Sequence, residues 1–374
     1  MKKLLFAISS LKNSGGSERS LIYRVNYLVQ NFNYDITIVT TDKDDVYSFY
    51  KIDSKVKVVN IPVKINKPSI WNSIGSLIYK SYKRESKIKE FIKENKFDIC
   101  SSVGSVNFLY QSKKNDSFIK VKESRFNYKR FFPDKRFNIG ILLWRLLRLI
   151  NSTLVLKKMD YVITLTEEDA KFWRKFLNKV YVMPNFINFK HISLSNLNSN
   201  NVIAVGRLER EKDFTSLIKA FAIVSNKYNN WKLEIYGEGS LRNALQDLIV
   251  SLQLTDCVFL KGAIGDIFSK YEESSIYVHT SLYEGFGNSI LEAMAHALPI
   301  VAFKSVGGVK LLVNDSHNGF SVPNRNIGGL AGKIIELIEN PEMRRKMGHN
   351  SREIASNFSE DKIMLQWHKF YSKI

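Results

Sequence analysis

The sequence predicts an α/β protein with two doubly wound domains. Short β-rich runs alternate with helical patterns in the first half, and the alternation restarts after residue 200. A segment rich in Asn and Ser, residues 188–200, separates the halves and has the composition of a linker. Strand–helix alternation implies a parallel sheet covered by helices on both faces. At 374 residues, the chain is long enough for two domains of ordinary size.

We expect the first domain to cover residues 1–187. The start, MKKLLFAISSL, has the charge and apolar pattern of a signal peptide, but the run is short and no small-residue cleavage site follows it, so we interpret it as a buried strand. The expected strands are Lys3–Ser9, Asp35–Thr41, Val56–Ile61, Phe97–Ser101, Tyr161–Thr164 and Lys179–Met183. The expected helices are Glu18–Gln30 and Ser86–Lys96.

We expect the second domain to cover residues 201–355. Its expected strands are Asn201–Val205, Trp231–Tyr236, Val258–Lys261, Ile276–His279 and Ile300–Phe303. Its expected helices are Thr215–Tyr228, Ser240–Leu252 and Ser289–Ala297. The last run, Phe358–Ile374, has an amphipathic helical pattern, and we expect the helix within residues 356–374 to pack back on the first domain.

The composition limits the function classes without choosing among them. The chain is 44% hydrophobic and 25% charged, a globular balance, and Lys and Arg exceed Asp and Glu by 56 − 36 = 20. That excess fits nucleic acid, anionic lipid, a phosphate-bearing substrate or a lysine-rich solvated surface. Cys100 and Cys257 fit no metal spacing and predict buried, reduced thiols of a cytosolic protein. No window of about eighteen uncharged apolar residues predicts a membrane-spanning helix.

Glycines and cations follow several predicted strands, where ligands of doubly wound sheets bind. Gly15 and Gly16 lie between the first strand and its helix, although a plain tight turn explains a lone pair of glycines equally well. Gly206 and Arg207 end the first strand of the second domain, and Lys212 follows shortly. Two cations at such a place suit a pyrophosphate, whereas the alternative is a solvated charged loop.

The stretch YEGFGNSILEAMAHALPIV carries two acids around a small polar bend. Glu284 precedes the bend, Glu292 comes eight positions later, and a helix is expected to begin near Asn288, with Asn288 or Ser289 as its N-cap. Free N–H groups at this helix start suit phosphates, and carboxylates suit sugar hydroxyls, so the segment has the chemistry to hold a nucleotide-sugar. The alternative is that Glu292 only complements the helix dipole and Glu284 is merely exposed.

The motif E-G-F-G-N-S-I-L-E resembles the E-x7-E motif of retaining GT-B glycosyltransferases of family 4, the glycosyl transferases group 1. Further motifs of that family match in order over nearly the whole chain, most strongly from Asn201 to Pro323: Gly15-Gly16-Ser17-Glu18-Arg19, Pro184-Asn185, Gly206-Arg207 with Glu211-Lys212, Ser305-Val306-Gly307-Gly308, and Asn318-Gly319-Phe320. The resemblance implies a GT-B fold, in which two Rossmann-like domains face each other across a cleft.

The resemblance also implies roles for the matching residues. The catalytic set would be Arg207 and Lys212, which would clamp the donor diphosphate, and Glu284, which would contact the donor sugar's hydroxyls. Glu292 would bind the ribose. The remaining donor-binding residues would be Gly206, Gly285, Phe286, Gly287, Asn288, Ser289, Gly15 and Gly16. No metal and no other cofactor is implied.

Two departures from the family pattern concern the sugar. Many members carry a histidine after a strand of the first domain, whereas this chain reads Lys122-Glu123-Ser124-Arg125-Phe126-Asn127, so Glu123, Arg125 and Asn127 are the candidates for that acceptor-side place. The family also often has G-G-x-P-E, whereas Leu311 replaces the acid here, which puts donor-sugar contacts there in doubt.

The acceptor side has one further pattern. Residues 113–158 contain thirteen Lys and Arg against three acids, interleaved with aromatic residues, and IGILLWRLLRLI lies among them. This composition is typical of a helix at the surface of an anionic membrane, and the alternative is a core helix with exposed arginines.

The resulting hypothesis is a metal-independent hexosyltransferase at the cytoplasmic side of the membrane. It would retain the anomeric configuration while moving a hexose or N-acetylhexosamine from a nucleoside-diphosphate sugar, with UDP favoured, to a glycan or lipid-linked acceptor of bacterial surface polysaccharide. A nucleotide-sugar epimerase of similar architecture is the nearer alternative, and a catalytically silent binding subunit is another. A basic nucleic-acid-binding protein is disfavoured because it does not explain the paired glutamates.

Overall fold

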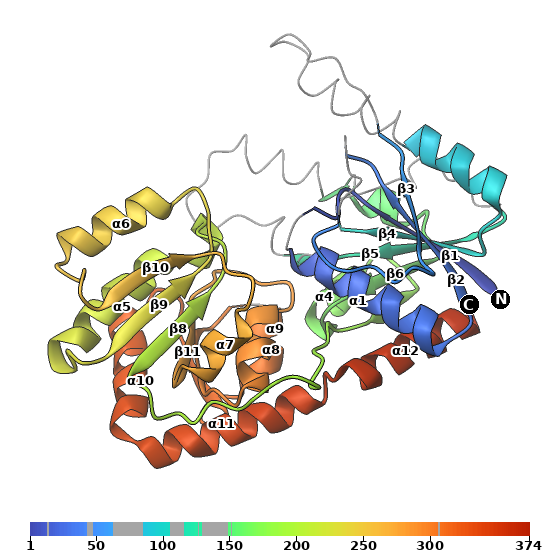
Figure 1. Ribbon diagram of the computed structural model, residues 1–374. Helices are drawn as coiled ribbons and strands as arrows, with labels where there is room; N and C mark the ends of the chain where they lie inside the picture. Colours follow the sequence, from blue (N-terminus) through green and yellow to red (C-terminus); the bar gives the residue numbers. More distant parts are fainter. Residues whose placement is uncertain are drawn as a thin grey trace, which may run out of the picture. The chain divides into compact units, whose positions relative to one another are not determined.

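The computed structural model describes residues 1–12, 15–42, 48–62, 85–104, 116–125, 127–128, 149–150, 152–305 and 307–374 (Figure 1). The chain divides into two compact units. The first unit contains Met1–Pro184 and Met364–Ile374, and the second contains Asn185–Ile363. Most of the basic segment at 113–158, including its apolar stretch, lies outside the described residues.

A parallel sheet of seven strands forms the centre of the first unit, in the order β3-β2-β1-β4-β5-β6-β7. Its strands are β1 Lys2–Ile8, β2 Tyr34–Thr40, β3 Lys57–Asn60, β4 Ile99–Val103, β5 Ile119–Glu123, β6 Tyr161–Thr164 and β7 Val180–Val182. The order reverses between β1 and β4, as it does in doubly wound folds.

Helices cover both faces of this sheet. The helix at 85–95 buries Ile88 and Ile92 with Leu5, Ala7 and Val39, and α4 (Glu167–Trp173) buries Ala170 and Trp173 against β6 and β7. Helix α1 (Gly16–Asn31) lies on the other face, where α12 (Glu360–Lys373) also packs. The side chain of Arg24 on α1 lies 4.0 Å from the ring of Trp367 on α12, and Lys2 donates to carbonyls at the end of α12.

Strand β5 was not among the predicted strands. Its sequence, IKVKE, places Lys120, Lys122 and Glu123 among five residues, a pattern that indicates an exposed segment. All three side chains are nevertheless buried. Each has a partner: Lys120 pairs with Asp160, Lys122 donates to Gly104 at 2.7 Å, and Glu123 binds Arg24.

The second unit has a parallel sheet of six strands, in the order β10-β9-β8-β11-β12-β13. These are β8 Asn201–Val205, β9 Lys232–Tyr236, β10 Val258–Gly262, β11 Ile276–His279, β12 Ile300–Phe303 and β13 Gly319–Val322. The order reverses between β8 and β11, so their carboxyl ends lie side by side at the point where doubly wound sheets bind ligands.

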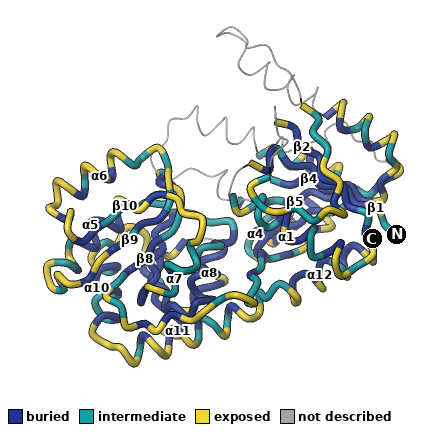
Figure 2. Tube along the Cα trace, viewed as in Figure 1, coloured by how far each residue is buried: buried dark blue, intermediate teal, exposed yellow. Residues whose placement is uncertain are grey.

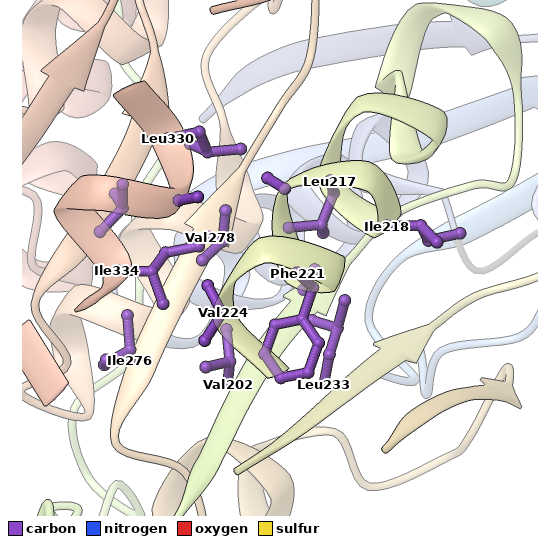
Figure 3. Packing of buried hydrophobic residues seen from close by; sticks show 14 of the residues in the cluster. Val202, Leu217, Ile218, Phe221, Val224, Leu233, Ile276, Val278, Leu330 and Ile334 are labelled. Atoms are coloured by element: carbon purple, nitrogen blue, oxygen red, sulfur yellow. The ribbon is translucent and has the colours of Figure 1, made fainter. Parts of the chain in front are cut away.

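Two layers of helices cover this second sheet. Its helices are α5 Phe214–Lys227, α6 Arg242–Ser251, α7 Phe268–Glu272, α8 Asn288–Ala295, α9 Gly308–Leu312, α10 Ile327–Glu339 and α11 Pro341–Ser356. Figure 3 shows Phe221 and Val224 of α5 and Ile334 of α10 packed against the strands. The strands are almost wholly buried, and exposed positions fall mainly on helices and loops (Figure 2).

The predicted fold class of two doubly wound parallel sheets is confirmed. Sequence patterns did not identify β13, α7 or α9–α11, which are short or lie beyond the strongest motifs. Residues 188–200 contain no helix or strand, yet Leu197 is buried, and its carbonyl accepts hydrogen bonds from the Arg344 guanidinium at 3.0 and 3.1 Å. Among the described residues, no helix is long and apolar enough to cross a membrane.

Candidate active site at the carboxyl edge of the second sheet

Lys212 and Glu284 meet where the strand order of the second sheet reverses. Lys212 ends the short 3-10 turn Arg210–Lys212 that follows β8, and Glu284 lies in the loop after β11. The Lys212 ammonium donates to Glu284 Oε1, although 72 positions separate the two residues in sequence. Their side chains are 17% and 14% exposed, so the pair is largely shielded but can be reached from solvent.

Backbone contacts fix the start of the Lys212 side chain. Its N–H donates to the Glu209 carbonyl at 2.9 Å, and its own carbonyl accepts from the Thr280 hydroxyl at 2.8 Å. The aliphatic part of the side chain passes over Gly206, where a Cβ would lie 3.4 Å from Lys212 Cδ and Cε. These contacts tie the turn after β8 to the end of β11.

One oxygen of Glu284 takes all the donors that the structure gives this carboxylate. Lys212, the Ser281 hydroxyl at 2.9 Å and His279 Nε2 at 3.3 Å all approach Oε1. Among the described residues, no group donates to Oε2. Burial opposes ionisation of Glu284, but the Lys212 charge and His279 hold its pKa well below the usual range of a carboxyl. The side chain is therefore an anion with one oxygen available to a ligand.

Arg207 does not join this pair. Its side chain is 72% exposed, and its guanidinium donates to Glu211 Oε1 at 2.6 Å. A surface pair of this kind contributes about 0–1 kcal/mol to stability and is readily exchanged for another anion. Of the two predicted cations, Lys212 is therefore placed beside Glu284, whereas Arg207 lies at the surface of the same edge.

The bend between the two glutamates leads directly into α8. Gly287 precedes the helix with φ 89°, a left-handed conformation that favours glycine. The expectation that Asn288 or Ser289 caps α8 is wrong, because both residues lie inside the helix and no side chain caps it. Asn288 Oδ1 instead accepts from Asn185 at 2.7 Å, and Ser289 Oγ accepts from Tyr277 at 2.8 Å.

The first turn of α8 keeps free donors, as helix starts do. Ile290 and Leu291 donate their backbone N–H groups to the Gly287 carbonyl. Among the described residues, no acceptor receives the backbone N–H of Asn288 or Ser289. Two N–H groups and the positive end of the helix dipole are thus available at the position where the sequence predicts an anion.

Glu292 lies one turn into α8 and is buried. Its Oε2 accepts from the Tyr271 hydroxyl at 3.1 Å. The alternative that Glu284 is merely exposed is wrong, because its side chain is 14% exposed. The alternative that Glu292 complements the helix dipole stays open.

Gly308 supports the bend from a second segment of the chain. A Cβ on Gly308 would lie 1.3 Å from the carbonyl oxygen of Phe286, so the start of α9 packs directly on the backbone of the bend. Phe286 is buried, and the centroid of its ring lies 5.6 Å from that of the Phe358 ring. The glycine at this place is therefore needed for a close backbone approach.

His279 is the residue at this edge that sequence reasoning missed. It ends the buried strand IYVH, where it was interpreted only as part of the strand pattern. Its ring is 3% exposed, and burial lowers its pKa. The available signal was its place at the carboxyl end of a strand, five residues before Glu284.

The remaining predicted residues belong to the first unit. Gly15 is the N-cap of α1, and Gly16 begins that helix. Glu123, Arg125 and Asn127 are all buried, and both oxygens of Glu123 bind guanidinium groups, from Arg24 at 2.7 Å and Arg125 at 2.5 Å. Glu123 is thus a charge partner inside the unit, while acceptor roles for these residues stay a prediction.

Within the described part of the chain, no three His, Cys, Asp or Glu side chains are grouped so that they could hold a metal ion. Cys100 and Cys257 are buried free thiols. Burial raises the pKa of both thiols, which favours the unreactive protonated form.

Comparison with known proteins identifies the family. Residues 185–354, which include the whole of this edge, match the family model described as Glycosyl transferases group 1. This part of the chain belongs to the glycosyltransferase family. An uncharacterized glycosyltransferase of Haemophilus influenzae is 29% identical over 98% of this chain and 99% of its own length.

Two further proteins extend the comparison. A Campylobacter jejuni relative is 24% identical over 100% of this chain and 99% of its own length; it is named GalNAc-alpha-(1->4)-GalNAc-alpha-(1->3)-diNAcBac-PP-undecaprenol alpha-1,4-N-acetyl-D-galactosaminyltransferase. The structure of a Staphylococcus aureus TarM variant with fondaparinux, α-GlcNAc-glycerol and UDP superposes with a TM-score of 0.78. The two sequences are 20% identical, and the superposition covers 99% of each chain. This likeness shows that the present chain has the GT-B fold.

Proposed function

We propose that this glycosyltransferase moves a hexose or N-acetylhexosamine from a UDP-sugar to a glycan or lipid-linked acceptor, with retention at the anomeric carbon, in the synthesis of bacterial surface polysaccharide or lipopolysaccharide. The observation that carries the proposal is the shielded Lys212–Glu284 pair at the switch point of the second sheet. A cation for a diphosphate and a carboxylate oxygen for sugar hydroxyls are held there side by side.

In the proposed complex, the donor diphosphate draws the Lys212 ammonium away from Glu284. Arg207 leaves its exposed pair with Glu211 and adds a second cation. The free N–H groups of Asn288 and Ser289 supply neutral donors without a further charge. No metal ion is needed for charge neutralisation in this arrangement.

The carboxylates take the hydroxyl groups of the donor. Glu284 Oε2 accepts from the sugar, because the Ser281 hydroxyl and His279 Nε2 lie at Oε1. Glu292 takes the ribose. Gly206, Gly285, Phe286 and Gly287 line the donor with their backbone.

The chemical step separates charge, and the site is suited to that separation. As the sugar–phosphate bond breaks, negative charge grows on the leaving diphosphate and positive charge on the sugar. The negative charge on the diphosphate is stabilised by preorganised electrostatics from Lys212, Arg207 and the start of α8. The departing phosphate accepts the proton of the acceptor hydroxyl, so no protein base is assigned.

We assign acceptor binding to the first unit, with Glu123, Arg125 and Asn127 as its candidate residues, and keep Gly15 and Gly16 among the proposed donor-binding residues. The relative from Campylobacter jejuni has an undecaprenol-linked acceptor in its name, which supports a lipid-linked class. The basic composition of residues 113–158 supports a peripheral place at the cytoplasmic face of the membrane.

The first experiment is a donor screen with a matched pair of variants. Thermal shift with UDP-glucose, UDP-galactose, UDP-GlcNAc and UDP-GalNAc is expected to show stabilisation of the wild type by one of them. Lys212→Ala is expected to lose that shift and to lower the transfer rate by about 10²–10³-fold. Lys219→Ala, an exposed lysine of α5, is the control.

Three outcomes overturn the proposal. A wild-type protein that binds none of the four UDP-sugars has another function, and a Lys212→Ala variant with normal affinity places the donor elsewhere. Conversion of the sugar without an acceptor, detected by product analysis, indicates the epimerase alternative.

A further inference from the structure

A line of buried polar side chains lies next to the Lys212–Glu284 pair. His279 Nε2 lies 3.3 Å from Glu284 Oε1, and its Nδ1 lies 3.3 Å from the Tyr277 hydroxyl. The Tyr277 hydroxyl is in turn 2.8 Å from Ser289 Oγ at the start of α8. His279 therefore lies between Glu284 and Tyr277, which is bonded to the start of α8.

Burial determines the protonation of this imidazole. His279 and Tyr277 are both fully enclosed, and desolvation lowers the histidine pKa, so the ring is neutral near pH 7. A neutral imidazole has one donor and one acceptor nitrogen. Because Glu284 is an anion and only accepts, the tautomer with its hydrogen on Nε2 is the one that suits the contact with Glu284.

We propose that His279 is a positioning residue that holds Glu284 in its sugar-binding orientation after Lys212 turns to the donor diphosphate. This inference rests on the donor site proposed above. Lys212 cannot bind the Glu284 carboxylate and the donor diphosphate equally well at the same time. When the donor is bound, Glu284 therefore needs other hydrogen-bond donors on Oε1.

The geometry meets that need. When the ammonium leaves, Oε1 keeps the Ser281 hydroxyl, and the buried His279 Nε2, which lies 3.3 Å away without another partner among the described residues, becomes its second donor. Ser281 lies on the same loop as Glu284 and moves with it, whereas His279 lies on the sheet and is fixed by it. The contact with His279 thus holds Oε1 against the sheet, and Oε2 stays directed to the ligand.

The Tyr277 hydroxyl links this histidine to the start of α8. It donates to Ser289 Oγ at 2.8 Å and lies 3.3 Å from His279 Nδ1. On the side away from Glu284, His279 therefore faces a buried tyrosine that is bonded to the first turn of α8.

Two polar substitutions separate positioning from folding. In His279→Gln the amide N–H can reach the place of Nε2, whereas in His279→Asn it reaches only the place of Nδ1. Both variants keep a polar group in the strand, so their stabilities should match. The readouts are affinity for each of the four UDP-sugars, affinity for UDP alone, and the kcat and KM of transfer.

We expect His279→Asn to weaken binding of the preferred UDP-sugar by about 10–100-fold, a range seen for residues that orient ligand-binding side chains. UDP affinity should stay within about twofold, because UDP has no sugar for Glu284 to bind. His279→Gln should recover most of the lost affinity. Equal losses for UDP and UDP-sugar, or equal behaviour of the two variants, would overturn the proposal.

The design distinguishes this failure from failure of the donor site itself. If the wild type binds a UDP-sugar and Lys212→Ala does not, the donor site stands, and the histidine variants test positioning alone. If the wild type binds no UDP-sugar, the donor site is wrong and His279 has no such role.

Discussion

Replacing Glu123 by Gln removes the negative charge from a buried cluster in the first unit. The carboxylate binds Arg24 at 2.7 Å through Oε1 and Arg125 at 2.5 Å through Oε2, and the Ser101 hydroxyl donates to Oε1 at 2.8 Å. Arg24 also stacks on Trp367 of the C-terminal helix. In the variant, two buried guanidinium groups lose the charge of this carboxylate.

Two independent arguments give the size of the effect. Burial opposes ionisation of Glu123, but the two guanidinium charges hold its pKa at about 2, compared with an ordinary 4.5. At about 1.4 kcal/mol for each tenfold change in proton affinity, this difference corresponds to about 3 kcal/mol. Removal of one partner from a buried pair costs about 3–5 kcal/mol in mutational studies. The side chain is 1% exposed, so screening by solvent does not reduce the value.

The assay is thermal unfolding followed by circular dichroism. For a unit of this size, a loss of about 3 kcal/mol lowers the Tm by roughly 6–12 °C. The control is Glu94→Gln, an exposed glutamate of the helix at 85–95, which should shift the Tm by less than about 1 °C. A Glu123→Gln variant that melts with the control would show that the cluster contributes little and would refute the reasoning.

Two further predictions concern pH and packing. Burial lowers the pKa of Lys122 from 10.5 to about 7, so above pH 7 the unfolded chain binds a proton that the folded chain does not, and stability should rise by about 1–2 kcal/mol between pH 7 and 8.5. Denaturant titrations at the two pH values test this rise, and Lys122→Met should abolish it; an equal rise in that variant would assign it to another group. Gly308→Ala should lower the Tm of the second unit, and weaken UDP-sugar binding, because its Cβ cannot fit 1.3 Å from the Phe286 carbonyl oxygen. Gly328→Ala on α10, where no atom lies within 4 Å of a new Cβ, is the control and should be neutral or stabilising; equal melting of the two variants would contradict the packing argument.

Sequence patterns predicted the two sheets because most of their strands are apolar runs between helical patterns. Strand β5 was not predicted because Lys120 and Lys122 are typical of solvent-facing positions. Only the tertiary contacts show how their charges are accommodated. Propensity and periodicity report local preference, whereas burial of a lysine depends on partners from distant segments.

The candidate site was predictable as a list of residues but not as an arrangement. Lys212 and Glu284 follow from motifs, yet their pairing depends on the adjacency of β8 and β11, which are not consecutive in sequence. Arg207 has the same motif-level support but is exposed. His279 carries no motif, because its importance comes only from the atoms around it.

The pairing of Lys212 with Glu284 has an energetic consequence for donor binding. A shielded ammonium without a counter-charge would cost several kcal/mol, and Glu284 supplies that counter-charge while the site holds no ligand. A diphosphate replaces one anion by another and leaves the lysine paired throughout, while Glu284 is released to a neutral hydroxyl donor. When Lys212 moves to the diphosphate, Glu284 loses its ion pair. The Ser281 hydroxyl and His279, which remain at Oε1, reduce the free-energy cost of this loss. Selectivity for a complete nucleotide-sugar over the bare nucleotide follows from this, because only the sugar supplies Glu284 with a new partner when the lysine leaves.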